Sequence, residues 1–191
     1  GAEDPLLAAI DPASTSEAPG PGPGEAIITL PNGERQRIST SGGFAGLLPA
    51  PIAGMTQQGP GGLLPIVAAD GRTPATAYAR PFTANGKPKV SLVIGGLGLQ
   101  AGITRQAIEN LPAEVTLSFA IHADNLQGWI DLARQHGHEV LLETPLEPID
   151  YPQNDPGPLT LLANARPEEM TKRLDAILVK ATGYFGVTNY L

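Results

Sequence analysis

The chain of 191 residues contains no cysteine, which excludes disulfide bonds, a thiolate nucleophile and cysteine-ligated zinc. Basic residues are few, with 12 Lys and Arg against 19 Asp and Glu. The net charge of −7 argues against a nucleic-acid partner, because no basic patch is available to neutralise phosphates. The sequence has no run of about 18 apolar residues, so it predicts no membrane-spanning helix. These absences leave an acidic chain long enough for one domain of ordinary size.

Glycine and proline are abundant, with 23 and 20 residues, and they are concentrated in the first part of the chain. Residues 1–25 cannot bury enough apolar surface to offset the entropy of ordering, which predicts a disordered segment or tether. Residues 26–86 predict an extended arm with a short hairpin at Asn32 and Gly33 and a turn at residues 70–74. Such an arm either lies along the folded body or contacts a second copy of the chain or another protein.

Residues 87–191 alternate between strand and helix patterns. Residues 89–94 form an apolar run that predicts a strand buried on both faces, and a glycine-rich turn follows at Gly95 and Gly96. Further strands are predicted at residues 115–119, at residues 139–142 and from Tyr184 onward. This order predicts an α/β fold with a parallel sheet, open or barrel-like, whose site lies at the carboxyl ends of the strands.

The helix after the first strand is expected to bury an apolar face formed by Ile103, Ala107, Ile108 and Leu111. The chain stops at Leu191, directly after the fourth predicted strand. A parallel sheet that ended there would leave an open edge. We therefore expect either later residues or a partner to cover that edge.

The glycine-rich turn fits the dinucleotide-binding pattern G-x-G-x-x-A over residues 96–101. That pattern also requires an acidic residue at the end of the second strand to hold the ribose. Here the strand runs into His122, and the first acidic residue, Asp124, is more typical of a helix cap. The glycines are therefore better explained by a tight turn and close helix packing than by a nucleotide site.

The three histidines differ in where the predicted sheet places them. His122 lies just past the carboxyl end of a strand, where a site residue would sit, although a structural role is also open. His136 and His138 precede the third strand at its amino end, which predicts surface or packing residues. No two histidines have the H-x-x-x-H spacing of metal ligands.

Acidic residues gather after the third strand. Glu143 and Glu147 flank a short stretch at its carboxyl end, and Asp150 and Asp155 follow in the same proline-rich loop. Several carboxylates at one end of a sheet can bind a cation or act as acid and base. The alternative is a solvated acidic loop held in shape by its prolines, and the sequence leaves both interpretations open.

Several segments together resemble the divergent polysaccharide deacetylase family: VSLVIGGLG at residues 90–98, LPAEVTLSF at 111–119, GHEVLL at 137–142, PLEP at 145–148, NDPGP at 154–158 and GVTNY at 186–190. The resemblance covers about residues 88–191. It implies a distorted (β/α) barrel, here incomplete at its C-terminus, related to the carbohydrate esterases that remove N-acetyl groups from glycans. It also implies a protein of the bacterial periplasm or cell envelope.

The sequence departs from this family at the expected metal site. The resemblance implies an Asp pair at the end of the first strand, one a general base and the other a metal ligand with two histidines. Gly95 and Gly96 stand at that pair, and Asn189 is followed by tyrosine where many members have Asn-His. A glycine can neither accept a proton nor ligate zinc, so no cofactor is predicted. A divalent metal such as zinc is expected only if Glu143, Glu147 or His122 builds a non-standard site.

Three functions follow as expectations. The first is an envelope protein that binds a glycan, such as a peptidoglycan fragment, with lost or altered deacetylase activity; its substrate-binding residues would be Gly95, Gly96, Asp155 and Asn189. The second is an active carbohydrate esterase with a non-standard site, for which the catalytic candidates are Glu143, Glu147 and His122. The third is a structural protein whose N-terminal arm, residues 26–82, binds a second copy or an envelope partner.

Overall fold

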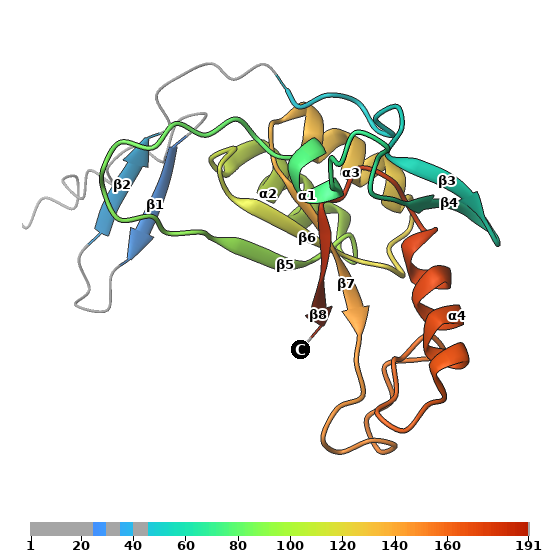
Figure 1. The fold of residues 1–191 in the computed structure, drawn as a ribbon. Helices are drawn as coiled ribbons and strands as arrows, with labels where there is room; N and C mark the ends of the chain where they lie inside the picture. Colours follow the sequence, from blue (N-terminus) through green and yellow to red (C-terminus); the bar gives the residue numbers. More distant parts are fainter. Residues whose placement is uncertain (1–24, 30–34, 40–45, 191) are drawn as a thin grey trace, which may run out of the picture.

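A parallel sheet of four strands forms the centre of the computed structural model, which describes residues 25–29, 35–39 and 46–190. The strands lie in chain order and are β5 (Val93–Leu97), β6 (Thr116–Ala120), β7 (Val140–Pro145) and β8 (Gly186–Tyr190). The helices between them are α2 (Ala101–Asn110), α3 (Leu126–Gln135) and α4 (Pro167–Leu178) (Figure 1). The predicted α/β order and parallel sheet are confirmed. Within the described residues β5 and β8 are the two edges, so the sheet is open there.

The main core lies between one face of the sheet and its helices. Leu117 and Phe119 of β6 alternate with polar or small residues and point toward this core, as Leu142 of β7 does. Ile108 of α2 and Ile130 of α3 pack against them, fully buried. All five residues of β6 are buried, as expected for a strand covered on both faces.

The first strand of the sheet differs from the prediction. The expected strand at residues 89–94 is wrong in its bounds, because β5 begins only at Val93 and includes both glycines. Its predicted burial is also wrong, since Val93 and Ile94 are 51% and 41% exposed. The physical reason is that β5 is an edge strand that pairs only with β6, and its register shifts between Ile94 and Leu97.

The helix α2 also departs in part from expectation. Ile108 is buried as predicted, but Ile103 is 56% exposed and Thr104 takes the buried place instead. Thr104 is drawn inward because its hydroxyl accepts a hydrogen bond from the Gly98 N–H at 2.8 Å. The start of α2 is thereby tied to the end of β5. No helix of the described residues is long and apolar enough to cross a membrane.

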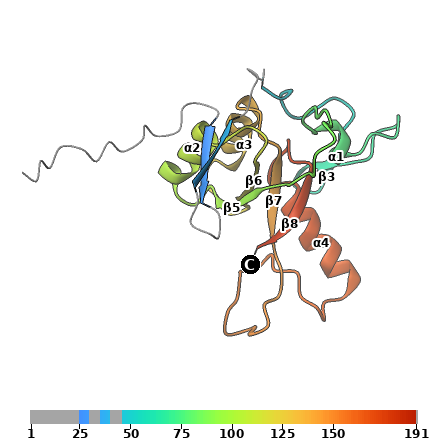
Figure 2. The same ribbon diagram turned by 90° about the vertical axis from the view of Figure 1, so that its left-hand side faces the viewer.

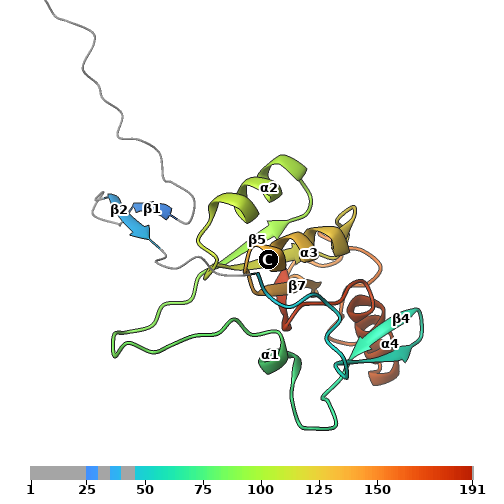
Figure 3. The same cartoon turned by 90° about the horizontal axis from the view of Figure 1, so that it is seen from above.

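The N-terminal part contains more structure than the sequence predicted. The expected first hairpin forms from β1 (Glu25–Thr29) and β2 (Arg35–Ser39), whose turn lies outside the described residues, as does most of the predicted tether. A second antiparallel hairpin, β3 (Thr56–Gly59) and β4 (Gly62–Pro65), was not predicted. It lies against α4, and the short helix α1 (Pro74–Ala77) follows it (Figure 3).

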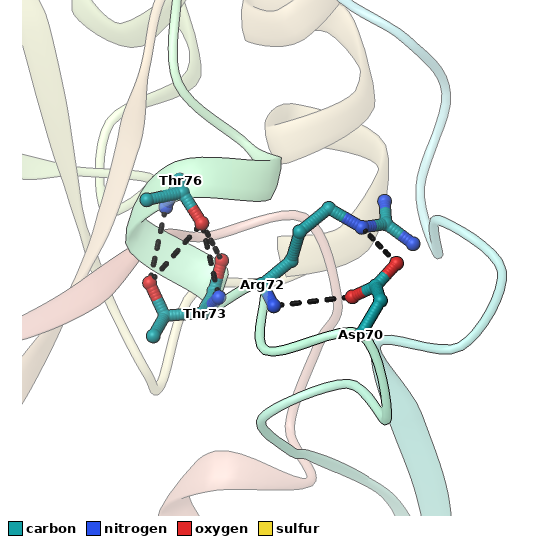
Figure 4. Close-up of polar contacts among 4 residues, drawn as sticks. All are labelled: Asp70, Arg72, Thr73 and Thr76. Carbon is teal, nitrogen blue, oxygen red and sulfur yellow. Dashed lines mark hydrogen bonds and ion pairs between the residues drawn. The ribbon is translucent and has the colours of Figure 1, made fainter.

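The predicted turn at residues 70–74 is formed by local polar contacts. The Asp70 carboxylate accepts a hydrogen bond from the Arg72 backbone N–H and forms an ion pair with the Arg72 guanidinium at 2.7 Å (Figure 4). The side chains of Thr73 and Thr76 then form a capping box at the start of α1. The contacts are exposed, so they shape the turn and contribute little to global stability.

A buried arginine fastens this N-terminal part to the sheet domain. Arg134 of α3 is 2% exposed. Its guanidinium donates to the carbonyl oxygens of Leu48 at 2.8 Å and Gly183 at 3.3 Å, and it lies 4.9 Å from the ring centre of Tyr78. We call these contacts the Arg134 clamp. They join α3, the segment before β8 and two points of the N-terminal segment.

His138 joins α2 to the sheet, as expected for a packing residue. Its ring nitrogens lie 2.8 Å from the Val115 carbonyl oxygen and 3.0 Å from that of Ile108. The Ile108 carbonyl has no helical partner, because the residue four positions later is Pro112, which lacks an N–H. Burial lowers the pKa of His138, and the two carbonyl contacts oppose this shift. A neutral imidazole has one N–H and donates to one carbonyl at a time.

Replacing His138 by phenylalanine is expected to lower the free energy of unfolding by about 2–4 kcal/mol, because two buried carbonyls lose their polar neighbour. Urea denaturation monitored by circular dichroism measures the change. The matched control is His136→Phe on the same connection, since His136 is exposed and its replacement should change stability by less than about 0.5 kcal/mol. Equal effects of the two variants would show that the contacts of His138 contribute nothing.

Candidate functional site

At the carboxyl ends of the strands, one buried acidic side chain reaches across the sheet. Glu143 lies near the end of β7 and is 4% exposed. Its Oε1 accepts a hydrogen bond from the Gly96 N–H of β5 at 2.6 Å, although β6 lies between the two strands. The side chain can cross this face because Ser118 and Ala120 of β6 share it and are small.

Gly95 provides the space for this crossing. A Cβ atom at residue 95 would lie 2.9 Å from Glu143 Oε1, closer than such atoms approach. The carboxyl group of Glu143 thus occupies the volume that a side chain at residue 95 would need. The glycine pair and Glu143 therefore form one site. Strand β5 contributes the backbone N–H of Gly96, and strand β7 contributes the carboxyl group of Glu143.

The environment of Glu143 favours its neutral form. Burial raises the pKa of the Glu143 carboxyl, while the Gly96 N–H and the nearby Ser118 hydroxyl act in the opposite direction. The second oxygen, Oε2, is buried and has no hydrogen-bond partner, and the Ser118 hydroxyl also lacks one of regular geometry. A charged carboxylate with one oxygen unpaired in the interior is costly, so burial has the larger effect.

A cavity of about 140 Å³ opens beside this carboxyl group. Its walls are formed by Leu99, Ala120, Ile121, His122, Glu143, Pro145 and Pro156. Glu143 and His122 are its two titratable residues, so two of the three predicted catalytic candidates meet here. A wider depression of about 500 Å³ shares Ile121 and His122 with this cavity, and its other lining residues include Asn125 and Lys180.

The third catalytic candidate and the predicted loop residue have local contacts instead. Glu147 does not line the cavity; its Oε2 accepts a hydrogen bond from the Ala163 N–H at 2.8 Å. Asp155 accepts one from the Gly157 N–H at 2.9 Å. Both carboxylates therefore shape the long loop between β7 and α4, which extends beyond the carboxyl end of the sheet (Figure 2).

The predicted substrate residue Asn189 lies on β8, next to β7. The register pairs Thr188, rather than Asn189, with Glu143, so Asn189 falls on the opposite face of the sheet by alternation. Gly96 has room around it, because a Cβ there would meet no atom within 4 Å. Gly95 and Gly96 thus share the site with Glu143 and His122, and the structure does not bring Asn189 to the same face.

The residues present do not fit the divalent metal that the family resemblance implies. Among the described residues, no group of three His, Asp or Glu side chains is placed to hold a metal ion. Gly95 and Gly96 offer no side-chain ligand, and Glu143 Oε1 already accepts the Gly96 N–H. His122 is the one further ligand type in the cavity wall, whereas structural and catalytic zinc sites use three or four protein ligands.

Sequence reasoning missed Ser118 as a member of this site. A signal for it was present, because Ser118 is a small polar residue in the middle of a fully buried strand, two positions before its carboxyl end. Such a residue on a fully buried strand requires a polar neighbour. The neighbour, Glu143, belongs to another strand, and the register that places them together is visible only in the fold.

Comparison with known proteins supports the reading of the fold. The family model of the divergent polysaccharide deacetylases matches residues 92–191, from β5 to the end of the chain. The crystal structure of an uncharacterized protein from Agrobacterium tumefaciens C58 is similar, with 48% sequence identity and a TM-score of 0.65 over 68% of this chain and 53% of that one. The chain thus spans about half the length of that relative. No curated protein matches. The chain belongs to the divergent polysaccharide deacetylase family.

Proposed function

We propose that this protein binds an N-acetylated glycan, such as a peptidoglycan fragment, at the carboxyl end of its sheet, and that it does not perform metal-assisted deacetylation. Membership of the family supports a carbohydrate-related function. The observation that carries the proposal is the position of Glu143, whose carboxyl group fills the space above Gly95 and accepts the Gly96 N–H. At the end of β5, where the resemblance implies a pair of acidic residues, the only acidic group among the described residues is therefore the buried carboxyl of Glu143.

The cavity beside Glu143 suits an acetamido group in its chemistry. Its volume of about 140 Å³ has room for such a substituent. The walls from Leu99, Ile121 and Pro156 suit a methyl group, and the Glu143 carboxyl supplies the polar contact that an amide requires. The ring of the sugar would then lie at the mouth of the cavity, next to the polar depression around His122.

The same proposal includes the cell context that the resemblance implies. We propose a location in the bacterial periplasm or cell envelope, where N-acetylated glycans are present, and a sheet that forms part of a distorted (β/α) barrel. The N-terminal arm is proposed to contact a second copy or an envelope partner. Density-gradient or light-scattering measurements on the full chain test the second copy directly.

Titration with the tetramer of N-acetylglucosamine, followed by NMR or calorimetry, tests the binding. We expect saturable binding by the wild type and a loss of at least tenfold in affinity for Glu143→Ala, because the cavity loses its polar wall. Glu109→Ala, an exposed carboxylate on α2 paired with Arg105, is the matched control and should bind as the wild type does. Shifts confined to residues far from Ile121, His122 and Glu143, or no binding, would contradict the proposal.

A second function is favoured by one observation, namely that Glu143 and His122 line the same cavity. In an esterase of non-standard type, water would attack the amide carbonyl while one of these residues takes its proton. The same proton is then donated to the departing nitrogen as the C–N bond breaks, and acetate and an amine are released. Acetate release that persists with a chelator and disappears in His122→Ala would establish this function. Absence of acetate at saturating tetramer would leave binding as the function.

A further inference from the structure

The two oxygens of the Glu143 carboxyl group have different surroundings. Oε1 accepts the Gly96 N–H at 2.6 Å, and it can do so whether the group is charged or neutral. Oε2 has no partner, although it is buried. The side chain forms part of the cavity wall, so a ligand seated there lies beside a carboxyl group with one unpartnered oxygen.

The groups around Oε2 do not compensate a negative charge. The cavity wall contains no lysine or arginine, and its other titratable residue is His122, from the turn between β6 and α3. The turn between β5 and α2 contributes Leu99 and the long loop contributes Pro156, neither of which carries a charge. Burial raises the pKa of the Glu143 carboxyl, and the hydrogen bonds from Gly96 and Ser118 only partly oppose it. An acid in such surroundings keeps its proton to a higher pH than an exposed acid does.

We propose that Glu143 engages its ligand as the neutral acid, donating the proton of one carboxyl oxygen to a carbonyl oxygen of the ligand. This inference rests on the proposed glycan-binding function and specifies the group that is recognised. The partner of a neutral carboxyl O–H is an acceptor, such as the carbonyl oxygen of an acetamido substituent. A free amine, which is an ammonium ion at neutral pH, would instead require a carboxylate. The site thus selects N-acetylated over de-N-acetylated sugars without a metal ion.

Proton linkage gives this recognition a characteristic pH dependence. If the ligand binds only the neutral acid, its affinity is constant below the pKa of Glu143 in the free protein. Above that pKa the affinity falls by about tenfold for each pH unit, because the proton must be restored before the ligand can bind. A site that binds through the carboxylate shows the opposite sign, with affinity that rises with pH up to the pKa of the group and is constant above it.

The experiment measures the dissociation constant of the N-acetylglucosamine tetramer between pH 4.5 and 8.5, with the glucosamine tetramer as the second ligand. The wild type is expected to lose affinity for the acetylated tetramer toward high pH and to bind the amine form at least tenfold more weakly. In Glu143→Gln the amide keeps both a donor and an acceptor but cannot titrate. This variant should bind the acetylated tetramer at pH 8.5 at least tenfold more tightly than the wild type does.

Two further variants test whether Glu143, rather than a neighbouring residue, causes the pH dependence of binding. His122→Ala should retain the decline of affinity with pH, which excludes His122 as the titrating group. Thr144→Val is the matched control on the same strand, because Thr144 is buried and lies outside the cavity wall, and it should show the wild-type pH profile. Binding that strengthens with pH, stays flat, or loses its pH dependence in His122→Ala would overturn the inference and leave glycan binding intact. No binding by the wild type at any pH would overturn the proposed function itself, and the inference with it.

Discussion

Replacement of Arg134 by methionine is expected to lower the free energy of unfolding by about 3–5 kcal/mol, because several buried carbonyls lose a charged donor at once. Methionine keeps most of the apolar stem, so the loss comes from the hydrogen bonds rather than from a cavity. The carbonyl of Leu48 loses two donors, at 2.8 and 3.2 Å, and that of Gly183 loses one. The ring of Tyr78 also loses its cation.

Urea unfolding and limited proteolysis test the Arg134 clamp together. The midpoint of unfolding should fall, and protease sites in residues 46–80 should become accessible before those of the sheet. Arg72→Met provides the matched control, because the ion pair of Arg72 with Asp70 is exposed and worth less than about 1 kcal/mol. A stability of Arg134→Met close to that of Arg72→Met would show that the N-terminal segment is held by other contacts.

The second large effect is expected at Gly98, in the turn between β5 and α2. Its φ of +92° lies in a region that side chains disfavour by about 1–2 kcal/mol. A Cβ atom there would also overlap the Cβ of Ala123, which forces backbone movement at a further cost of about 1–3 kcal/mol. Gly98→Ala should therefore lose about 2–5 kcal/mol of stability. It should also displace the turn that carries Leu99 and weaken ligand binding.

Gly102 offers a control for this substitution within the same connection. It lies in the first turn of α2, and a Cβ there would meet no atom within 4 Å. Gly102→Ala should raise the free energy of unfolding by about 0.5–1 kcal/mol, because alanine favours the helix. Chemical denaturation of both variants should show changes of opposite sign in the free energy of unfolding. A Gly98→Ala variant as stable as the wild type would mean that the turn adopts another conformation without cost.

The parallel sheet was predictable because its inner strands have strong local signals. β6 and β7 are apolar and β-branched at the expected positions, His122 lies in the turn after β6, and Glu143 lies near the end of β7. These two residues were assigned to the site edge by a general property of parallel sheets, which the structure follows. The predicted burial of residues 89–94 was wrong, because the exposure of an edge strand depends on what covers it and cannot be inferred from the local pattern. The predicted burial of Ile103 was wrong because Thr104, bound to the Gly98 N–H, takes the inward position instead.

Long-range polar contacts account for most of what the sequence did not reveal. Arg134 near the end of a helix predicts a solvated side chain, yet its partners Leu48 and Gly183 lie 86 and 49 positions away. The contact of Glu143 with Gly96 spans 47 positions and an intervening strand. Neither pairing can be inferred from the amino-acid composition or from the spacing of apolar residues, since each depends on how distant segments meet in the fold.

The crossing of Glu143 over Gly95 makes these two positions epistatic. A first substitution that adds a side chain at residue 95 meets the carboxyl oxygen at 2.9 Å, while the same substitution after Glu143 has been shortened does not. An acid at residue 95 is therefore expected to be accommodated more easily once residue 143 has been shortened. A library that varies the two positions together will reveal combinations that a scan of residue 95 alone misses.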